Sequence, residues 1–193
     1  MSSMWPMSLR ARLLDAAYDA AVTTGWAATR MADVAKAAGT SRQTLYAEFG
    51  TKEGLAQALA LREAARFMDG SEAVLTGHEG SPAEAVAAST EWTLRVARED
   101  PLIKAVLTDD GAEGLLPYLT TRSDALIRAV TDRHVDYLRS HWPELPDGDL
   151  EFVADTVVRL TVSHIVTPAG PAETTARQIA HLVDRLLPGG TTA

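Results

Sequence analysis

The stretch at residues 29–52, TRMADVAKAAGTSRQTLYAEFGTK, constrains the fold more than any other part of the sequence. Apolar residues recur at helical spacing over 31–38, and Gly39 then provides a positive-φ residue at which a helix ends with little strain. Ser41 is a good N-cap for a second short helix over 42–48. Two short helices joined by a tight glycine turn are typical of a helix-turn-helix, whose second helix is the recognition helix.

The second helix begins with side chains that suit the reading of DNA bases. Arg42, Gln43 and Thr44 stand at its start, and arginine suits guanine whereas glutamine suits adenine. Tyr46 and Lys52 are residue types that contact phosphates. An ordinary helical hairpin is the alternative, but its solvated face would more usually be rich in Glu and Lys. We therefore predict that Arg42, Gln43 and Thr44 read bases.

The residues around this motif also resemble a known family. Residues 10–58 contain LLDAA, a GW turn, VAKAAG and TLYxxFxxKExL, and the combination is similar to the DNA-binding domain of TetR-family transcriptional regulators. The resemblance implies an all-α fold of about nine helices. It also implies a three-helix DNA-binding domain at residues 1–52 and a helical regulatory and dimerisation domain at residues 53–193.

Two positions depart from the common pattern of that family. Arg30 stands where a second hydroxyl often follows Thr29, and Glu48 stands where His or another neutral polar residue is frequent. A carboxylate at position 48 repels phosphate but can accept a hydrogen bond from cytosine N4, so it bears on the operator sequence. Thr29 is also the expected N-cap of the helix at 31–38. The predicted phosphate contacts are Thr29, Arg30, Tyr46 and Lys52, with Arg10 and Arg12 as further candidates.

The charge distribution fits a protein that binds DNA through one end only. The chain has a net charge of -8, but residues 1–52 contain six basic and four acidic side chains, against 12 and 22 in the remainder. There is no cysteine, no apolar run long enough for a transmembrane helix and no apolar segment typical of a signal peptide. We therefore expect a cytoplasmic protein without a membrane partner.

Periodicity and capping signals predict the remaining elements. The glycine-rich segment at 69–81 is expected to be a loop or a frayed helix end, and a turn-rich segment is expected at 108–119. Ser81, Pro82 and Glu84 form a strong helix start. The remaining predicted helices span 8–24, 52–68, 82–99, 101–107, 121–142, 149–166 and 172–187.

The last two helices, within 149–187, predict a homodimer. The helix at 149–166 is apolar over more than half of its circumference, so it has two sides to bury. A four-helix bundle with the same helices of a second copy would bury both sides. A larger monomeric bundle is the alternative.

A ligand pocket is expected in the helical body, because the family typically binds a small molecule there. For each candidate the alternative is an ordinary core residue whose polar atom is satisfied. An apolar cavity with few polar groups predicts an uncharged or weakly polar ligand. The candidates are Trp92, Leu107, Tyr118, Leu126, Val130, His134, Tyr137, Thr161 and His164.

No catalytic residue, metal site or cofactor is predicted. The chain has no HExxH, GxSxG or Walker sequence, and His134 and His141 lie seven residues apart, too far for an adjacent-turn zinc pair. The sequence predicts a ligand-responsive repressor that binds a palindromic operator as a homodimer. The alternative is a helical ligand-binding or adaptor protein that retains the head fold without binding DNA, which the acidic balance and Glu48 favour.

Overall fold

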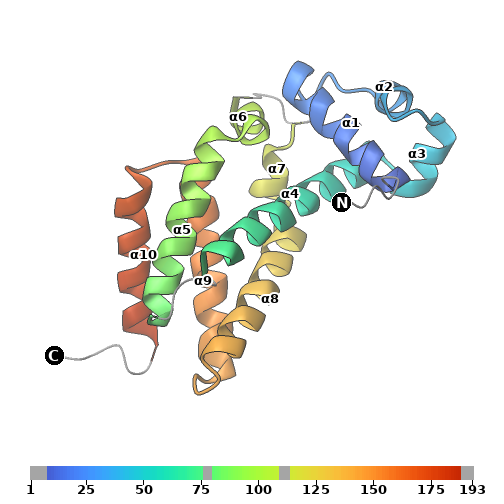
Figure 1. Cartoon of the computed structure of the whole chain (residues 1–193). Coiled ribbons are helices and arrows are strands. Elements are labelled where there is room, and N and C mark those ends of the chain that lie inside the picture. The colour runs from blue at the N-terminus through green and yellow to red at the C-terminus, as the bar shows by residue number, and fades with distance from the viewer. Residues whose placement is uncertain (1–7, 76–79, 109–113, 188–193) are drawn as a thin grey trace, which may run out of the picture. The chain divides into compact units, whose positions relative to one another are not determined.

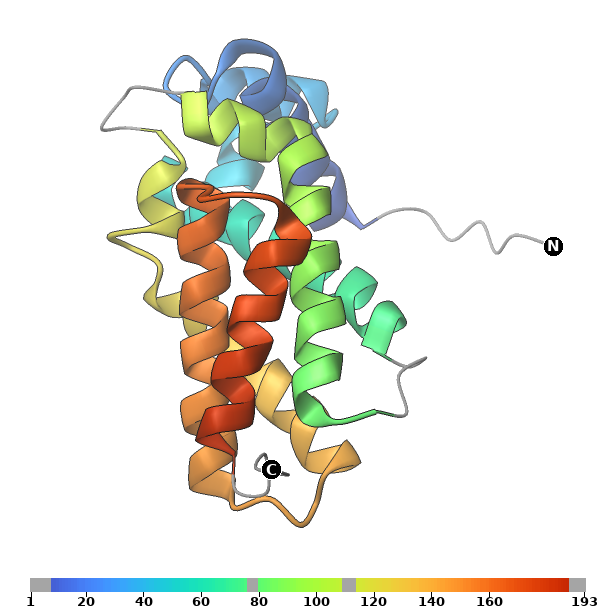
Figure 2. The ribbon, with the colours of Figure 1, turned by 90° about the vertical axis from the view of Figure 1, so that its left-hand side faces the viewer.

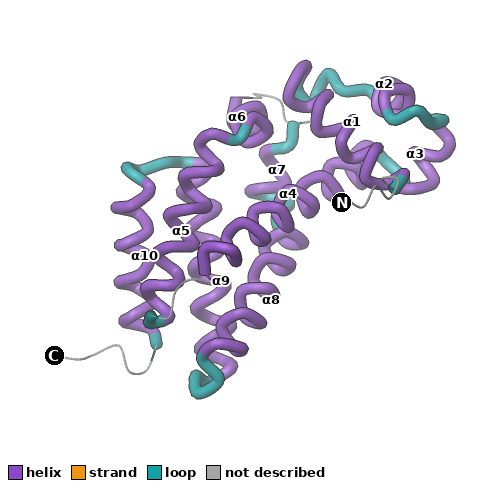
Figure 3. Tube along the Cα trace, in the orientation of Figure 1, coloured by secondary structure: helices purple, strands orange, loops and turns teal. Residues whose placement is uncertain are grey.

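The computed structural model describes residues 8–75, 80–108 and 114–187, and within these ranges it contains ten α-helices and no strand (Figures 1 and 3). The predicted all-α class is confirmed. The described residues form one helix more than the nine or so expected. The additional helix is α7 (Leu116–Leu119), a single turn in a segment predicted as turn-rich. One compact unit spans Met1–Arg62 and Pro101–Thr121, and a second spans Glu63–Asp100 and Arg122–Ala193.

The first unit contains the predicted helix-turn-helix. Its helices are α1 (Leu9–Thr24), α2 (Met31–Ala37), α3 (Arg42–Phe49), the start of α4 (Lys52–Leu75), α6 (Pro101–Thr108) and α7. They share one buried cluster, in which Leu13, Leu45, Leu55 and Leu59 are fully buried. Because α6 and α7 contribute Leu102, Val106 and Tyr118 to this cluster, the first unit takes in a segment well beyond residue 52. The functional boundary between residues 52 and 53 stays a prediction.

Side-chain caps explain where α1 and α3 begin, whereas α2 begins without one. Ser8 and Ser41 accept hydrogen bonds from the backbone amides of Ala11 and Thr44, each at 3.1 Å. Gly39 has φ of 67° in the turn between α2 and α3. The predicted N-cap role of Thr29 is wrong, because Arg30 is the N-cap of α2 and makes no side-chain capping bond. The Thr29 side chain is buried instead.

The second unit is a bundle built on α5 (Pro82–Glu99), α8 (Asp124–His141), α9 (Asp147–Val166) and α10 (Ala172–Leu186), with the end of α4. Figure 2 shows α10 flanked by α5 and α9. These three helices bury Val86, Val157 and Val183 in one cluster. Helices α8 and α9 form a hairpin around a second cluster that includes Leu138 and Leu150. No helix in the described ranges is both long and apolar enough to cross a membrane.

The predicted helix end at residue 68 is wrong, because α4 continues to Leu75 into the segment expected to be a loop or a frayed helix end. Gly70 is one of the glycines of this segment, and a Cβ at this position would overlap the ring of Trp92 on α5. The glycine therefore makes room for an indole ring. Asp69 and Glu72 on the same turn pair with Arg133 of α8, which further stabilises the helix. Residues 76–79 lie outside the described ranges.

The other helix boundaries differ little from prediction. The capping box at Ser81 and Glu84 is confirmed. Helix α8 begins at Asp124, three residues later than expected, and α9 begins at Asp147, two residues earlier. Residues 109–113 of the predicted turn-rich segment lie outside the described part of the chain.

The contact between α3 and α4 yields a stability prediction. A Cβ at Gly54 would overlap the backbone carbonyl oxygen of Phe49, which cannot move like a side-chain end. We expect Gly54→Ala to lower the free energy of unfolding by about 1–3 kcal/mol, as overpacking does. Gly148→Ala is the matched control, since nothing lies within 4 Å of its Cβ. Equal urea unfolding curves for the two variants would contradict the close packing of α3 on α4.

Candidate functional site

One face of α3 is exposed while its opposite side is anchored in the core. Leu45 is fully buried, and Phe49 packs against the same cluster. Arg42, Gln43 and Tyr46 are exposed, with 41% of Tyr46 accessible. The side chains predicted to read bases thus lie on a short helix whose rotation about its axis is set by Leu45. This arrangement presents a cationic, an amide and a phenolic group together to solvent.

Thr44, the third predicted base reader, is less available than its neighbours. It is half-buried, and its hydroxyl lies 2.8 Å from that of Ser41, the N-cap of the same helix. A hydroxyl can donate one hydrogen bond while accepting others, so this contact leaves Thr44 some capacity for a further partner. Base reading by Thr44 stays a prediction.

The predicted phosphate contacts differ in exposure. Arg30 and Tyr46 are exposed. Lys52 is half-buried at the start of α4, where its Nζ donates to the Ala27 carbonyl at 3.1 Å and lies 5.6 Å from the Trp26 ring centroid. Thr29 is only 6% exposed, and its hydroxyl donates to the Gly25 carbonyl at 2.9 Å. A backbone partner inside the turn therefore engages Thr29, whereas Arg30 and Tyr46 are open to an anion.

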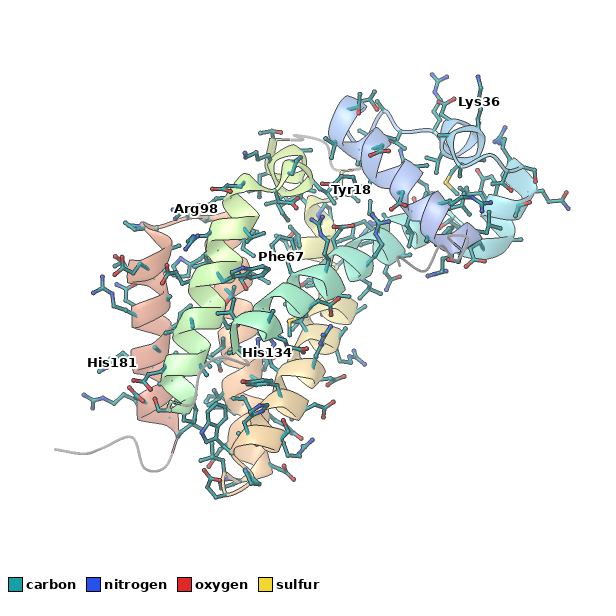
Figure 4. The ribbon with its side chains drawn as sticks, in the orientation of Figure 1. Tyr18, Lys36, Phe67, Arg98, His134 and His181 are labelled. Atoms are coloured by element: carbon teal, nitrogen blue, oxygen red, sulfur yellow. The ribbon has the colours of Figure 1, made fainter. Side chains whose placement is uncertain are left out.

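Two further basic side chains of the first unit lie on α1 and α2. Lys36 points outward from α2 (Figure 4). Arg10, in the first turn of α1, pairs with Glu48 of α3 at 2.6 Å between Nη1 and Oε1. The carboxylate at position 48 is thus neutralised by a residue 38 positions away. The sequence offers no local signal for such a pair.

The predicted ligand-pocket residues do not all belong to one unit. Leu107 on α6 and Tyr118 on α7 lie in the first unit. Leu107 is 36% exposed, and the buried Tyr118 donates its hydroxyl to the Glu53 carbonyl at 3.3 Å. The other seven lie in the second unit, on α5, α8 and α9: Trp92, Leu126, Val130, His134, Tyr137, Thr161 and His164.

Three polar atoms inside the second unit lack a hydrogen-bond partner among the described residues. They are the Tyr137 hydroxyl, His164 Nδ1 and the hydroxyl of Thr131, which is not among the predicted pocket residues. A buried polar atom left unsatisfied costs about 1–3 kcal/mol. Burial also raises the pKa of Tyr137, so its hydroxyl stays protonated and can donate. These atoms are available to a ligand or to water.

Arg133 and His134 lie on α8, between Thr131 and Tyr137 in the sequence. Arg133 binds both Glu72 oxygens, at 2.5 and 2.7 Å, and Asp69 at 2.7 Å, and these carboxylates raise its pKa. His134 carries its proton on Nδ1, which donates to the Val130 carbonyl at 2.9 Å. Burial lowers the pKa of His134, so the ring is neutral at neutral pH (labelled in Figure 4). The arginine of this turn is therefore committed to carboxylates, and the histidine carries no charge.

Two segments of the chain each match the model of a known protein family. Residues 13–59 match the family model of bacterial regulatory proteins of the tetR family. Residues 82–185 match the model of the C-terminal domain of the bacterial tetracyclin repressor.

Individual relatives agree with these matches. The chain is 35% identical over 175 residues to the HTH-type transcriptional regulator AlkX of Mycobacterium tuberculosis, covering 91% of this chain and 83% of that protein. It is 30% identical to the crystal structure of the TetR family repressor AlkX from Dietzia sp., implicated in biodegradation of n-alkanes, with a TM-score of 0.77 and coverage of 96% and 97%. The repressor QsdR of R. erythropolis shares the fold at 16% identity, with a TM-score of 0.66 and coverage of 93% and 94%.

The neutral His134 yields a pH prediction. Its pKa is lowered from the ordinary value of 6.5, so below about pH 6.5 the unfolded chain binds a proton that the folded chain does not. Proton binding favours the unfolded chain at low pH. The contribution of His134 to the free energy of unfolding is therefore present above pH 6.5 and is lost as the pH falls. We expect the free energy of unfolding of His134→Gln to change less steeply between pH 7.5 and 5.5 than that of the wild type.

Urea unfolding at a series of pH values would measure this difference. His181→Gln is the matched control, because His181 lies exposed on α10 and points away from the bundle (Figure 4). If the wild type and His134→Gln gave parallel profiles, burial of a neutral ring at position 134 would be ruled out.

Proposed function

The chain belongs to the TetR family of bacterial transcriptional regulators, and from this premise we propose that it is a repressor controlled by a small molecule. It binds a palindromic operator as a homodimer through residues 1–52, and its helical part at 53–193 dimerises and binds the effector. It acts in the cytoplasm, where bacterial DNA lies. The observation that carries the proposal is the exposed α3 face with Arg42, Gln43 and Tyr46, held in place by the buried Leu45.

Base reading is divided among neighbouring positions of α3. Arg42 can bind guanine O6 and N7 in a bidentate manner, and Gln43 can bind adenine N6 and N7. Thr44 adds a hydroxyl with shorter reach. Thr29, Arg30, Tyr46 and Lys52 hold phosphates, and among them the exposed Arg30 and Tyr46 have the strongest structural support.

Dimerisation through 149–187 is supported by apolar side chains that one copy leaves uncovered. Phe152 on α9 is 59% exposed, the highest exposure among the large hydrophobic residues that the structure describes. Leu182 and Leu186 on α10 are only half-buried. A symmetric four-helix contact would cover such side chains. A dimer would also place two recognition helices on successive major grooves, about 34–36 Å apart.

The effector is an uncharged or weakly polar molecule bound in the second unit. The unpartnered atoms of Thr131, Tyr137 and His164 offer hydrogen bonds, and no charge on His134 attracts an ion. The implication of the Dietzia relative in n-alkane biodegradation supports an apolar effector and a role in hydrocarbon metabolism. To release DNA, the effector needs a differential affinity of a few kcal/mol for the conformation that does not fit the operator.

Arg42→Ala tests the placement of the base-reading face. We expect the variant to lose about 1–3 kcal/mol of operator affinity and to relax specificity at one base pair in each half-site, because one bidentate contact is removed. Selection from a random duplex library would first provide the wild-type operator, and fluorescence anisotropy would then give dissociation constants for each substituted base pair.

Two further variants make the test specific. Tyr46→Phe should weaken binding to all sequences alike, because a phosphate contact carries no base information. Arg95→Ala on α5, an exposed arginine of the second unit, is the control for loss of positive charge. If Arg42→Ala left affinity and sequence preference unchanged, the proposed placement of the base-reading face would be wrong. Failure of the wild type to select any duplex would favour the adaptor alternative.

Phe152→Ser tests the dimer. Because symmetry brings in two copies, we expect loss of at least about 2 kcal/mol of association free energy, as for an interface hot spot, with no loss of helical content. Sedimentation equilibrium measures the association constant. Val22→Ser is the control, since Val22 on α1 is also an exposed large hydrophobic residue, at 36%. An unchanged association constant in Phe152→Ser would place the interface elsewhere.

A further inference from the structure

We propose that Glu48 is a positioning residue for DNA binding: its carboxylate holds the Arg10 guanidinium beside the recognition helix, where the guanidinium contacts a DNA phosphate. This inference rests on the proposed function. It reverses the role expected for an acidic residue on this helix, which by itself would repel the phosphate backbone.

The geometry joins the first turn of α1 to the last turn of α3. Arg10 Nη1 donates to Glu48 Oε1 at 2.6 Å, and Arg10 Cζ lies 4.8 Å from the centroid of the Phe49 ring. The Phe49 ring packs against the core of the first unit. The guanidinium is therefore fixed at two points, by a carboxylate and by an aromatic face that belongs to the same helix as the base-reading side chains.

The pair leaves Arg10 able to bind a second anion. Its side chain is 51% exposed and that of Glu48 is 35% exposed. A guanidinium has five N–H donors, and Glu48 receives one of them. The remaining donors can meet a phosphate, for which the arginine fork is well suited.

Holding the side chain also reduces the entropy that binding would otherwise cost. A free arginine samples many rotamers, and a phosphate contact must restrict them. The two fixed points impose much of that restriction before DNA arrives, which favours binding. Arg12, on the same helix, donates from its Nε to the Ala38 carbonyl at 3.5 Å.

The competing role for Glu48 is direct reading of cytosine N4. In the structure its Oε1 already accepts from Arg10, so base reading would require the pair to open or the other oxygen to reach the groove. The two roles predict different effects of substituting Glu48. A positioning residue acts through Arg10, whereas a base reader acts without it.

The experiment uses the full-length protein and the duplex selected by the wild type. Arg10→Gln, Glu48→Gln and the double variant are measured by fluorescence anisotropy over a range of salt concentrations. Glu91→Gln on α5, which removes a carboxylate paired with Arg95 at 3.7 Å, is the matched control. Thermal unfolding by circular dichroism confirms that each variant is folded, as expected for exposed side chains.

We expect Arg10→Gln and Glu48→Gln to weaken binding to every duplex alike, by about threefold to tenfold. Arg10→Gln should also lower the slope of log affinity against log salt by about 2 for a dimer, because each subunit loses one phosphate contact. The double variant should bind no more weakly than Arg10→Gln. Glu91→Gln should bind like the wild type.

Three results would overturn the inference. Tighter binding by Glu48→Gln would mean that the carboxylate only repels DNA, and unchanged binding would mean that it has no role. A changed preference at one base pair in Glu48→Gln, without the same change in Arg10→Gln, would make Glu48 a base reader. In each case the wild type still binds DNA, so the proposed function stands. If the wild type itself bound no duplex, both the proposed function and this inference would fall.

Discussion

Burial of Leu45 is the constraint on which the DNA-binding surface depends. Helix α3 has only eight residues, and a helix of that length is not stable alone in water. It exists because Leu45 and Phe49 pack into the cluster that α1, α2 and α4 share. The same packing sets which residues face outward, so a core leucine determines where Arg42 and Gln43 point.

The ends of α3 complete this arrangement. The Ser41 hydroxyl accepts the amide of Thr44, and Gly39 and Gly50 have positive φ angles on either side of the helix. Side-chain and backbone groups thus satisfy both ends without covering the exposed face. The Arg10 guanidinium then pairs with Glu48, the one acidic side chain of α3. Fold stability and charge complementarity to DNA are provided by different residues of the same short helix.

Local signals in the sequence predicted the helix-turn-helix and helix caps in both units, whereas contacts between distant residues could not be predicted. The helix-turn-helix, the Ser41 cap and the capping box at Ser81 depend on neighbouring residues, so a single sequence displays them. The continuation of α4 through Gly70 could not be predicted, because the Trp92 ring that fills the space beside this glycine lies on another helix. The pocket assignment had the same difficulty, since periodicity cannot tell which buried polar atoms lack partners. Thr29 differs from these cases, because its hydroxyl donates to the Gly25 carbonyl only four residues away, and a hydroxyl at a helix start can make either this bond or a cap.

Under the proposed function, those unpartnered atoms would connect the interior of the second unit to regulation. The Tyr137 hydroxyl and His164 Nδ1 each carry a desolvation cost that no described residue offsets. A molecule that supplied both an apolar surface and a hydrogen bond would offset part of that cost in the conformation where it fits. It would gain nothing comparable in a conformation where these atoms already meet water or protein. Such a difference in affinity between two conformations is what a regulator requires, since tight binding to both would shift no population. The polar atoms left unsatisfied inside an apolar bundle are thus the feature through which a weakly polar effector would select one state of the protein.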